Sequence, residues 1–223
     1  MTNAYSLKAV VRVSRTGNRQ HLKKDDHSMK GIRNFLFLLL ISFVTSSFCF
    51  KSDIVIDKAE AKNAYLLLQE VRANPNKFYK ELQFKKDLKV STVKLVWNDT
   101  LARVAAEKAY DMAKRDYFDH VDPDGYGINY RINKSGYTLN PDWVKNKTAN
   151  TFESIVCNYF TGEEAIKALI IDKGVPSLGH RNHLLGLNAW NASLKDIGIG
   201  FVKRESGSKY QTYICVIIAK HNW

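Results

Sequence analysis

Cysteine is scarce in this sequence: there are three cysteines in 223 residues, and Cys49 lies in a segment that we expect to be removed. The two others, Cys157 and Cys215, are too few to build a disulfide-stabilised fold, so a hydrophobic core must supply the stability. The sequence leaves open whether they pair or stay as buried free thiols. Both stand among apolar residues, which raise the pKa of a thiol, so neither is predicted to be an activated nucleophile.

Other patterns that would announce a function are also absent. There is no serine nucleophile elbow and no His-Glu-x-x-His motif, which excludes the hydrolase classes that carry them. The formal net charge of +12 divides evenly: residues 1–50 hold eight Lys/Arg and two Asp, and residues 51–223 contribute the other +6. Because no dense Lys/Arg block with interleaved aromatics occurs, nucleic-acid binding is not predicted.

The N-terminal region is typical of a targeting sequence. Residues 29–49 begin with Met29, carry Lys30 and Arg33, continue into a ten-residue apolar run at 35–44 that only Ser42 interrupts, and have small residues at 45–47. This order predicts a secretory signal peptide, because a run of ten residues falls short of the roughly 20 that span a bilayer. Residues 1–28 are then an upstream extension.

An uncleaved signal anchor at 35–48, with a basic cytoplasmic tail, is the alternative for this region. Either way we expect a protein that is secreted, periplasmic or held at the cell envelope. After a lead segment at 50–57, residues 58–221 are long enough for one globular domain, and 45% hydrophobic and 25% charged residues are ordinary globular composition.

Hydrophobic periodicity predicts helices first and an antiparallel hairpin last. Apolar residues at helical spacing, bounded by capping residues, predict helices over 58–73, 99–115, 130–134, 161–170 and from 177 or 180 to 185, with a short helical turn at 78–82. Apolar strands are predicted at 197–202 and 213–219, with a turn at 205–208, and an early strand near 94–97 joins them. This order predicts an α+β layered domain.

Two histidine-bearing segments carry the chemistry of the sequence. Three of the six histidines lie in 119–125 and 179–183, and Glu153 lies between these segments. Imidazole and carboxylate groups are what proteins use to hold a metal or to move a proton near neutral pH. Because the segments are far apart in sequence, only tertiary folding can bring them into one site.

Six short motifs, taken together, resemble a known family. They are Leu95-Val96-Trp97-Asn98; Tyr117-Phe118-Asp119-His120 with Asp122-Pro123-Asp124-Gly125; Arg131-Ile132 with Ser135-Gly136-Tyr137; Phe152-Glu153-Ser154-Ile155; Ser177-Leu178-Gly179-His180-Arg181-Asn182-His183-Leu184-Leu185; and Asp196-Ile197-Gly198-Ile199-Gly200. In this order and spacing they resemble the bacterial branch of the CAP superfamily, named after cysteine-rich secretory proteins, antigen 5 and pathogenesis-related plant proteins. The resemblance covers roughly residues 60–220. It implies a three-layer α-β-α sandwich with a small antiparallel sheet.

The resemblance also implies a cleft with two histidines and two acidic residues that can hold a divalent cation, Zn²⁺ or Ca²⁺. Carried over residue by residue, the metal site consists of His120, Glu153, His180 and, as the second acid, Asp172. The disulfide-rich hinge of animal members is absent, so ion-channel activity is not implied. Asp122 and Asp124 also hint at calcium, but turn formation alone explains them because the full ligand spacing of a calcium loop is missing.

The sequence departs from the family pattern around Glu153. Phe152 and Ser154 replace the Gly and Asn of the family's Gly-Glu-Asn site, so the family's usual turn and amide contact are not carried over. A structural salt bridge from Glu153 to Arg181 is the simpler alternative for the acid. His183 lies three residues after His180 and is expected on an adjacent helix face, either behind the metal ligands or at the surface.

Three functions remain open on the sequence alone. We expect an exported binding module whose partner is an extracellular or cell-envelope lipid, glycan or protein, with no nucleic acid and no stable oligomer implied. The alternative is a metal-dependent, peptidase-like hydrolase with Glu153 as general base. In the third case the polar residues only brace the loops of the fold.

Overall fold

The computed structural model describes residues 53–221. The expected upstream extension, the signal peptide and the alternative signal anchor all lie outside these residues. Within them, no helix is both long enough and apolar enough to cross a membrane.

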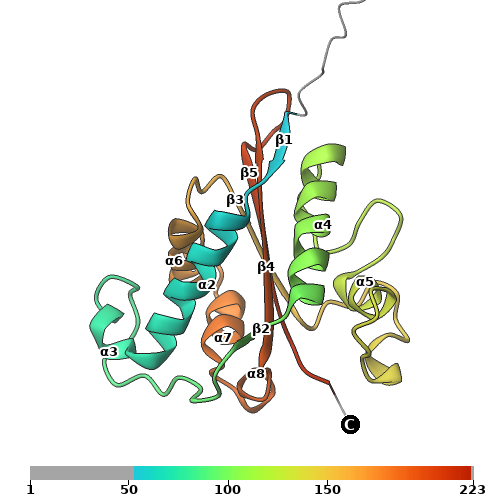
Figure 1. Ribbon diagram of the computed structural model, residues 1–223. Helices are drawn as coiled ribbons and strands as arrows, with labels where there is room; N and C mark the ends of the chain where they lie inside the picture. Colours follow the sequence, from blue (N-terminus) through green and yellow to red (C-terminus); the bar gives the residue numbers. More distant parts are fainter. Residues whose placement is uncertain (1–52, 222–223) are drawn as a thin grey trace, which may run out of the picture. The chain divides into compact units, whose positions relative to one another are not determined.

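A mixed sheet forms the middle of the described domain (Figure 1). Its strands are β1 (Ile54–Ile56), β2 (Val96–Trp97), β3 (Glu153–Cys157), β4 (Asp196–Arg204) and β5 (Thr212–Ala219). Their order is β1-β4-β5-β3, and β2 pairs in parallel with the start of β4. The predicted hairpin is β4 with β5, and the predicted early strand is β2. The sequence does not predict β1, which lies in the expected lead segment, or β3.

Helices cover both faces of this sheet. They are α2 (Lys58–Ala73), α3 (Pro75–Phe78), α4 (Asp99–Arg115), α5 (Ile128–Lys134), α6 (Gly162–Ile171), α7 (Gly179–Leu185) and α8 (Ala189–Ala192), with a 3₁₀ turn at Pro141–Trp143. Figure 1 shows α2, α6 and α7 on one side of the sheet and α4 and α5 on the other. The core fills the two spaces between these layers, where Leu68 and Ile166 on one side and Leu101 and Met112 on the other are fully buried. The fold is the predicted three-layer α-β-α sandwich.

Capping side chains explain where the longer helices begin. Asp57 accepts hydrogen bonds from the backbone N–H groups at the start of α2, at 3.0 and 3.1 Å, and Asn98 accepts one at 3.0 Å at the start of α4. Thr161 and Glu164 form the predicted capping box of α6. Each cap pairs N–H groups that the first helical turn leaves without a partner. The predicted helices 58–73 and 99–115 are confirmed at both ends.

Helix α4 lies directly against the backbone of β4. A Cβ atom at Gly198 would come within 2.1 Å of the backbone nitrogen of Ala102, and one at Gly200 within 2.3 Å of the carbonyl carbon of Ala105. Glycine on the strand is therefore required for this close approach. The contact fixes α4, and with it the loop that follows α4, over the end of the sheet.

Candidate functional site

A cavity of about 340 Å³ lies where the two histidine segments meet. Its lining includes His120, Glu153, Ser154, His180 and His183, with Asn150, Thr151 and Asn191 beside them. The structure thus brings three of the four predicted metal residues to one cavity. The fourth, Asp172, lies behind His180 and does not line the cavity.

The first of two histidine–carboxylate pairs joins a loop to the sheet. His120 Nδ1 lies 2.7 Å from Glu153 Oε2; the carboxylate is fully buried, and the imidazole side chain is 38% exposed. Glu153 begins β3, and its other oxygen, Oε1, accepts a hydrogen bond from Cys215 Sγ at 3.2 Å. Burial, and then the Glu153 charge, raise the pKa of the Cys215 thiol well above its ordinary value, which keeps it a donor. Cys157 and Cys215 are both free thiols.

A buried lysine holds the loop that carries His120. Lys108, on α4, has no exposed surface, and its Nζ donates to the carbonyl oxygens of Asp119 at 2.7 Å and His120 at 3.2 Å. It also donates to the Tyr117 hydroxyl at 3.2 Å. Burial lowers the pKa of Lys108, while the nearby charge of Glu153 acts in the opposite direction. The ammonium therefore fixes the His120 backbone and lies near enough to the Glu153 carboxylate to feel its charge.

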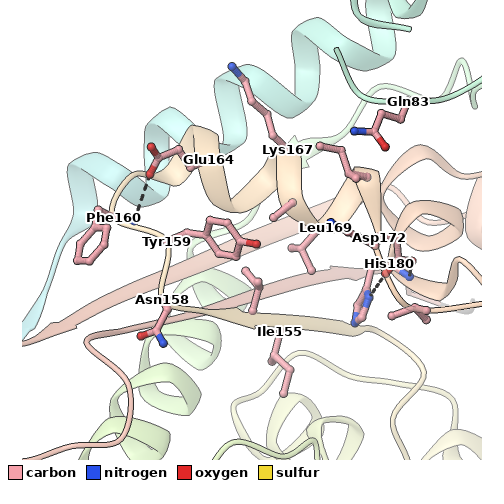
Figure 2. A pocket seen from close by; sticks show the side chains of 15 residues that line it. Gln83, Ile155, Asn158, Tyr159, Phe160, Glu164, Lys167, Leu169, Asp172 and His180 are labelled. Carbon is pink, nitrogen blue, oxygen red and sulfur yellow. Dashed lines mark hydrogen bonds and ion pairs between the residues drawn. The ribbon is translucent and has the colours of Figure 1, made fainter. Parts of the chain in front are cut away.

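The second pair lies at the junction of two helices. Asp172 ends α6 with left-handed backbone angles (φ 54°), and its Oδ1 lies 2.7 Å from His180 Nδ1 (Figure 2). Its other oxygen accepts the backbone N–H groups of His180 at 2.9 Å and Arg181 at 3.2 Å. The Arg181 guanidinium donates to the carbonyls of Ile170 and Ile171, at 2.6 and 2.8 Å. The alternative Glu153–Arg181 salt bridge is therefore not formed.

Both pairs dictate the same imidazole tautomer. When each carboxylate is ionised and each imidazole is neutral, Nδ1 carries the proton that the carboxylate accepts, and Nε2 keeps a lone pair. Carboxylates placed against Nδ1 are the usual outer partners of metal-binding histidines. Within residues 53–221, however, no three His, Cys, Asp or Glu side chains converge into a group that could hold a metal ion. Glu153 and Asp172 thus orient the imidazole rings, and Nε2 of His120 and Nε2 of His180 are the atoms left to coordinate a metal ion.

His183 also lines the cavity, and it is buried, so of the two places expected from the sequence, behind the metal ligands or at the surface, the surface is excluded. It is 7% exposed, and its Nδ1 lies 2.7 Å from the Ser154 hydroxyl. Burial lowers the pKa of His183 to about 4, although a backbone hydrogen bond with Ile218 acts in the opposite direction, so the ring is neutral at pH 7. The departure from the family pattern at Ser154 was the available signal: the serine hydroxyl here bonds an imidazole.

The Asp-Pro-Asp-Gly loop next to His120 is structural. Asp122 Oδ1 accepts two backbone N–H groups at 2.9 Å, and its Oδ2 accepts the Arg131 Nε at 3.1 Å. Asp124 pairs with Arg115 at 2.7 Å. Burial would raise the pKa of Asp122, but these hydrogen bonds outweigh it and lower that pKa. Both aspartates are thus occupied by turn formation and arginine pairing.

Comparison with known proteins identifies the family. The model of the cysteine-rich secretory protein family (CAP) matches residues 89–218. The chain belongs to this family, and the resemblance seen in the sequence is confirmed.

Bacterial proteins are among those to which the chain is similar. The chain is 35% identical over 111 residues to the uncharacterized protein YkwD of Bacillus subtilis (strain 168), a match that covers 50% of this chain but only 35% of that protein. It is similar in structure to an outer surface protein from Borrelia burgdorferi, with 19% identity, a TM-score of 0.50, and coverage of 75% and 97% of the two chains. An extracellular SCP-domain protein from Bacillus anthracis str. Ames matches at 18% identity and a TM-score of 0.41, with coverage of 72% and 41%.

Proposed function

We propose that this protein is an exported CAP-domain binding protein whose cleft accepts a divalent cation together with an extracellular or cell-envelope ligand. The observation that carries the proposal is the matched pair of imidazoles, each held at Nδ1 by a buried carboxylate 2.7 Å away. Export is supported by the signal-like residues 29–49 and by the family's secretory members. One fold neighbour is named an outer surface protein.

The donors present fit Zn²⁺ better than Ca²⁺. Zinc takes imidazole nitrogens readily, whereas calcium takes six to eight oxygen ligands. His120 and His180 would hold the ion through Nε2, and Glu153 and Asp172 would hold the rings from behind. A bound zinc ion supplies Lewis acidity and open positions for water or for an oxygen of the ligand. With two protein donors, the expected affinity is modest and improves when a ligand supplies a third.

A metal-dependent hydrolase is the second reading of the same cleft, and the geometry supports it less. A general base needs a free carboxylate oxygen within reach of a water. Glu153 is fully buried, and both of its oxygens are engaged, one by His120 and one by Cys215. Its contacts suit a residue that orients His120.

Calorimetric titration of the full chain with ZnCl₂ tests the proposal. We expect saturable binding that His120→Gln and His180→Gln each weaken by about tenfold or more, because each removes one of two donors and tenfold corresponds to about 1.4 kcal/mol. His221→Gln is the matched control, since His221 does not line the cavity. Its zinc affinity should equal that of the wild type.

The same variants separate binding from a purely structural role. If the wild type takes up no zinc, or if the double variant of His120 and His180 binds it as well as the wild type does, the cation proposal is wrong. A large fall in melting temperature in both single variants, without any zinc effect, would instead support loop bracing. Glu153→Gln gives the matching test of hydrolysis, because turnover that survives it and survives chelation cannot come from this cleft.

A further inference from the structure

A second cavity, of about 630 Å³, runs between β3 and α6 and is named here the β3 groove. Its lining includes Ile155, Val156 and Asn158 from the strand side and Glu164, Lys167 and Leu169 from α6. Figure 2 shows the groove with Tyr159 and Phe160 toward one end and Asp172 and His180 at the other. The two aromatic side chains are 37% and 58% exposed, which leaves apolar surface uncovered.

One edge of β3 has no strand partner within the described residues. Ile218 N donates to Phe152 O at 2.9 Å, and Asn158 N donates to Thr212 O at 3.1 Å. Because hydrogen bonding alternates along an antiparallel pair, the residues at 152, 154, 156 and 158 bond toward β5. The main-chain groups of the residues between them therefore point toward the free edge.

Only the first of these outward residues is satisfied by the protein itself. Asn150 bonds both main-chain groups of Glu153, accepting from its N–H at 3.1 Å and donating to its carbonyl at 3.4 Å. For the N–H and C=O groups of Ile155 and Cys157, no hydrogen-bond partner occurs among residues 53–221. The free edge of β3 thus presents two main-chain N–H donors and two C=O acceptors, spaced as an added β-strand would need them.

We propose that the β3 groove binds an extended polypeptide segment of a partner protein as an added strand on β3. Such a segment would pair with Ile155 and Cys157 through alternate residues and place its apolar side chains between the strand and α6. A lipid would cover the apolar walls but would leave four main-chain groups without water or partners, at a cost for each. The unpaired main chain is what favours a peptide.

The position of the groove and the charges along it indicate the length and the charge of the partner segment. The β3 groove and the histidine cavity share Val175 and His180, so a segment in the groove ends beside the cleft. Lys167 is bound to Glu81 at 2.7 Å, whereas Lys173, which is exposed, makes no ion pair in the described part of the chain. The five residues of β3 span about 17 Å, at about 3.3 Å per residue. The best fit is a segment of about five residues, alternating apolar and polar, with an acidic group at the His180 end.

The experiment selects peptides from a displayed library of random seven-residue sequences on the immobilised full chain, in the presence of a chelator. Chelation makes the result independent of the cation proposal. Cys157→Pro removes one outward N–H and no bond to β5, a position where edge strands tolerate proline. Cys157→Ala is the matched control, because it loses the same side chain and keeps the N–H. We expect the selected peptides to lose about tenfold in affinity for Cys157→Pro and less than about twofold for Cys157→Ala.

A second measurement does not depend on how the proline variant folds. N-methylation of the selected peptide at successive positions should abolish binding at alternate residues only, because every second N–H of an added strand faces β3. A selection without any peptide, uniform sensitivity to N-methylation, or equal affinity for the proline and alanine variants would each overturn the proposal. The proposal would also be overturned if oleate displaced the peptide and peptide binding did not depend on the main-chain N–H groups. Dimers of the full chain that Cys157→Pro abolishes would overturn it as well.

Discussion

The His120–Glu153 and His180–Asp172 pairs share a 2.7 Å contact at Nδ1 but draw on different parts of the chain. His120 and Glu153 are 33 residues apart and come from a loop and a strand, whereas His180 and Asp172 are eight residues apart at one helix junction. The first pair depends on Cys215 in β5 and on Lys108 in α4. The second is completed by the backbone of α7 itself.

This difference separates a site built by the core from one built by local capping. In the His120–Glu153 pair, every supporting group is buried and comes from another element of the fold. A substitution in the core should therefore change the position of His120. In the His180–Asp172 pair, the Asp172 residue ends α6, and its carboxylate caps the first turn of α7 and orients His180. We therefore expect the two halves of the cleft to fail under different substitutions.

The largest effect is expected from Lys108→Met. It leaves two loop carbonyls and the buried Glu153 charge without their cation, so the free energy of unfolding should fall by about 3 kcal/mol in urea titrations. The ring resonances of His120 should move while those of His180 stay. Lys114→Met, at an exposed position of the same helix, should change stability by less than about 0.5 kcal/mol. Equal shifts of both histidines would contradict the separation of the two pairs.

The second effect concerns His183, whose pKa is lowered by burial. The unfolded chain binds a proton near pH 6.5, but the folded protein resists it until about pH 4. The unfolding free energy should therefore decrease as the pH falls through this window, by about 3 kcal/mol at pH 4. The wild type and His183→Gln should accordingly differ in slope between pH 6.5 and 4 in chemical denaturation, whereas parallel profiles would show that His183 is not held neutral.

A third test compares the two acids directly. Glu153→Gln places an amide donor in a buried position built for an acceptor of two hydrogen bonds, and should cost about 2 kcal/mol. Asp172→Asn keeps a residue that tolerates left-handed backbone angles and still caps α7, so it should cost less than about 1 kcal/mol. Thermal unfolding of the two variants side by side compares their losses of stability. A costlier Asp172→Asn would reverse the comparison.

A smaller effect than that of Glu153→Gln is expected from Cys215→Ser. A hydroxyl can still donate to Glu153 Oε1, but it is shorter and more polar in a fully buried position, so a loss of about 1 kcal/mol is expected. Cys157→Ser, at a half-buried thiol without contact to the pair, is the control and should be nearly neutral. If only the Cys215 variant also changes zinc affinity, the thiol acts through Glu153 on His120.

Much of the fold could be predicted from the sequence because the signals were local. Asp57 and Asn98 cap helices whose apolar residues recur at helical spacing, and both helices lie where they were predicted. β3 was missed because Glu153 and Ser154, both buried, interrupt its apolar character at the start. β1 has only three residues, too few for a pattern to show.

The residues of the site could be predicted from the sequence, but the part that each residue plays in the site could not. The resemblance supplied His120, His180 and Glu153, and all three line one cavity. That Asp172 lies behind His180 depends on the left-handed turn that ends α6, and spacing alone does not reveal such a turn. His183 faces the cavity because α7 packs Ser154 of the edge strand against it, a contact between segments 29 residues apart.

The glycine contacts between α4 and β4 have a consequence for motion. Because the helix lies on strand backbone at Gly198 and Gly200, it cannot slide along the sheet without meeting side chains of neighbouring residues. We therefore expect the wall that carries His120 to move little, and any opening of the cavity to come from the opposite wall, the seven-residue α7. The cleft should open from one side only, with amide hydrogens of α7 exchanging with solvent long before those of α4.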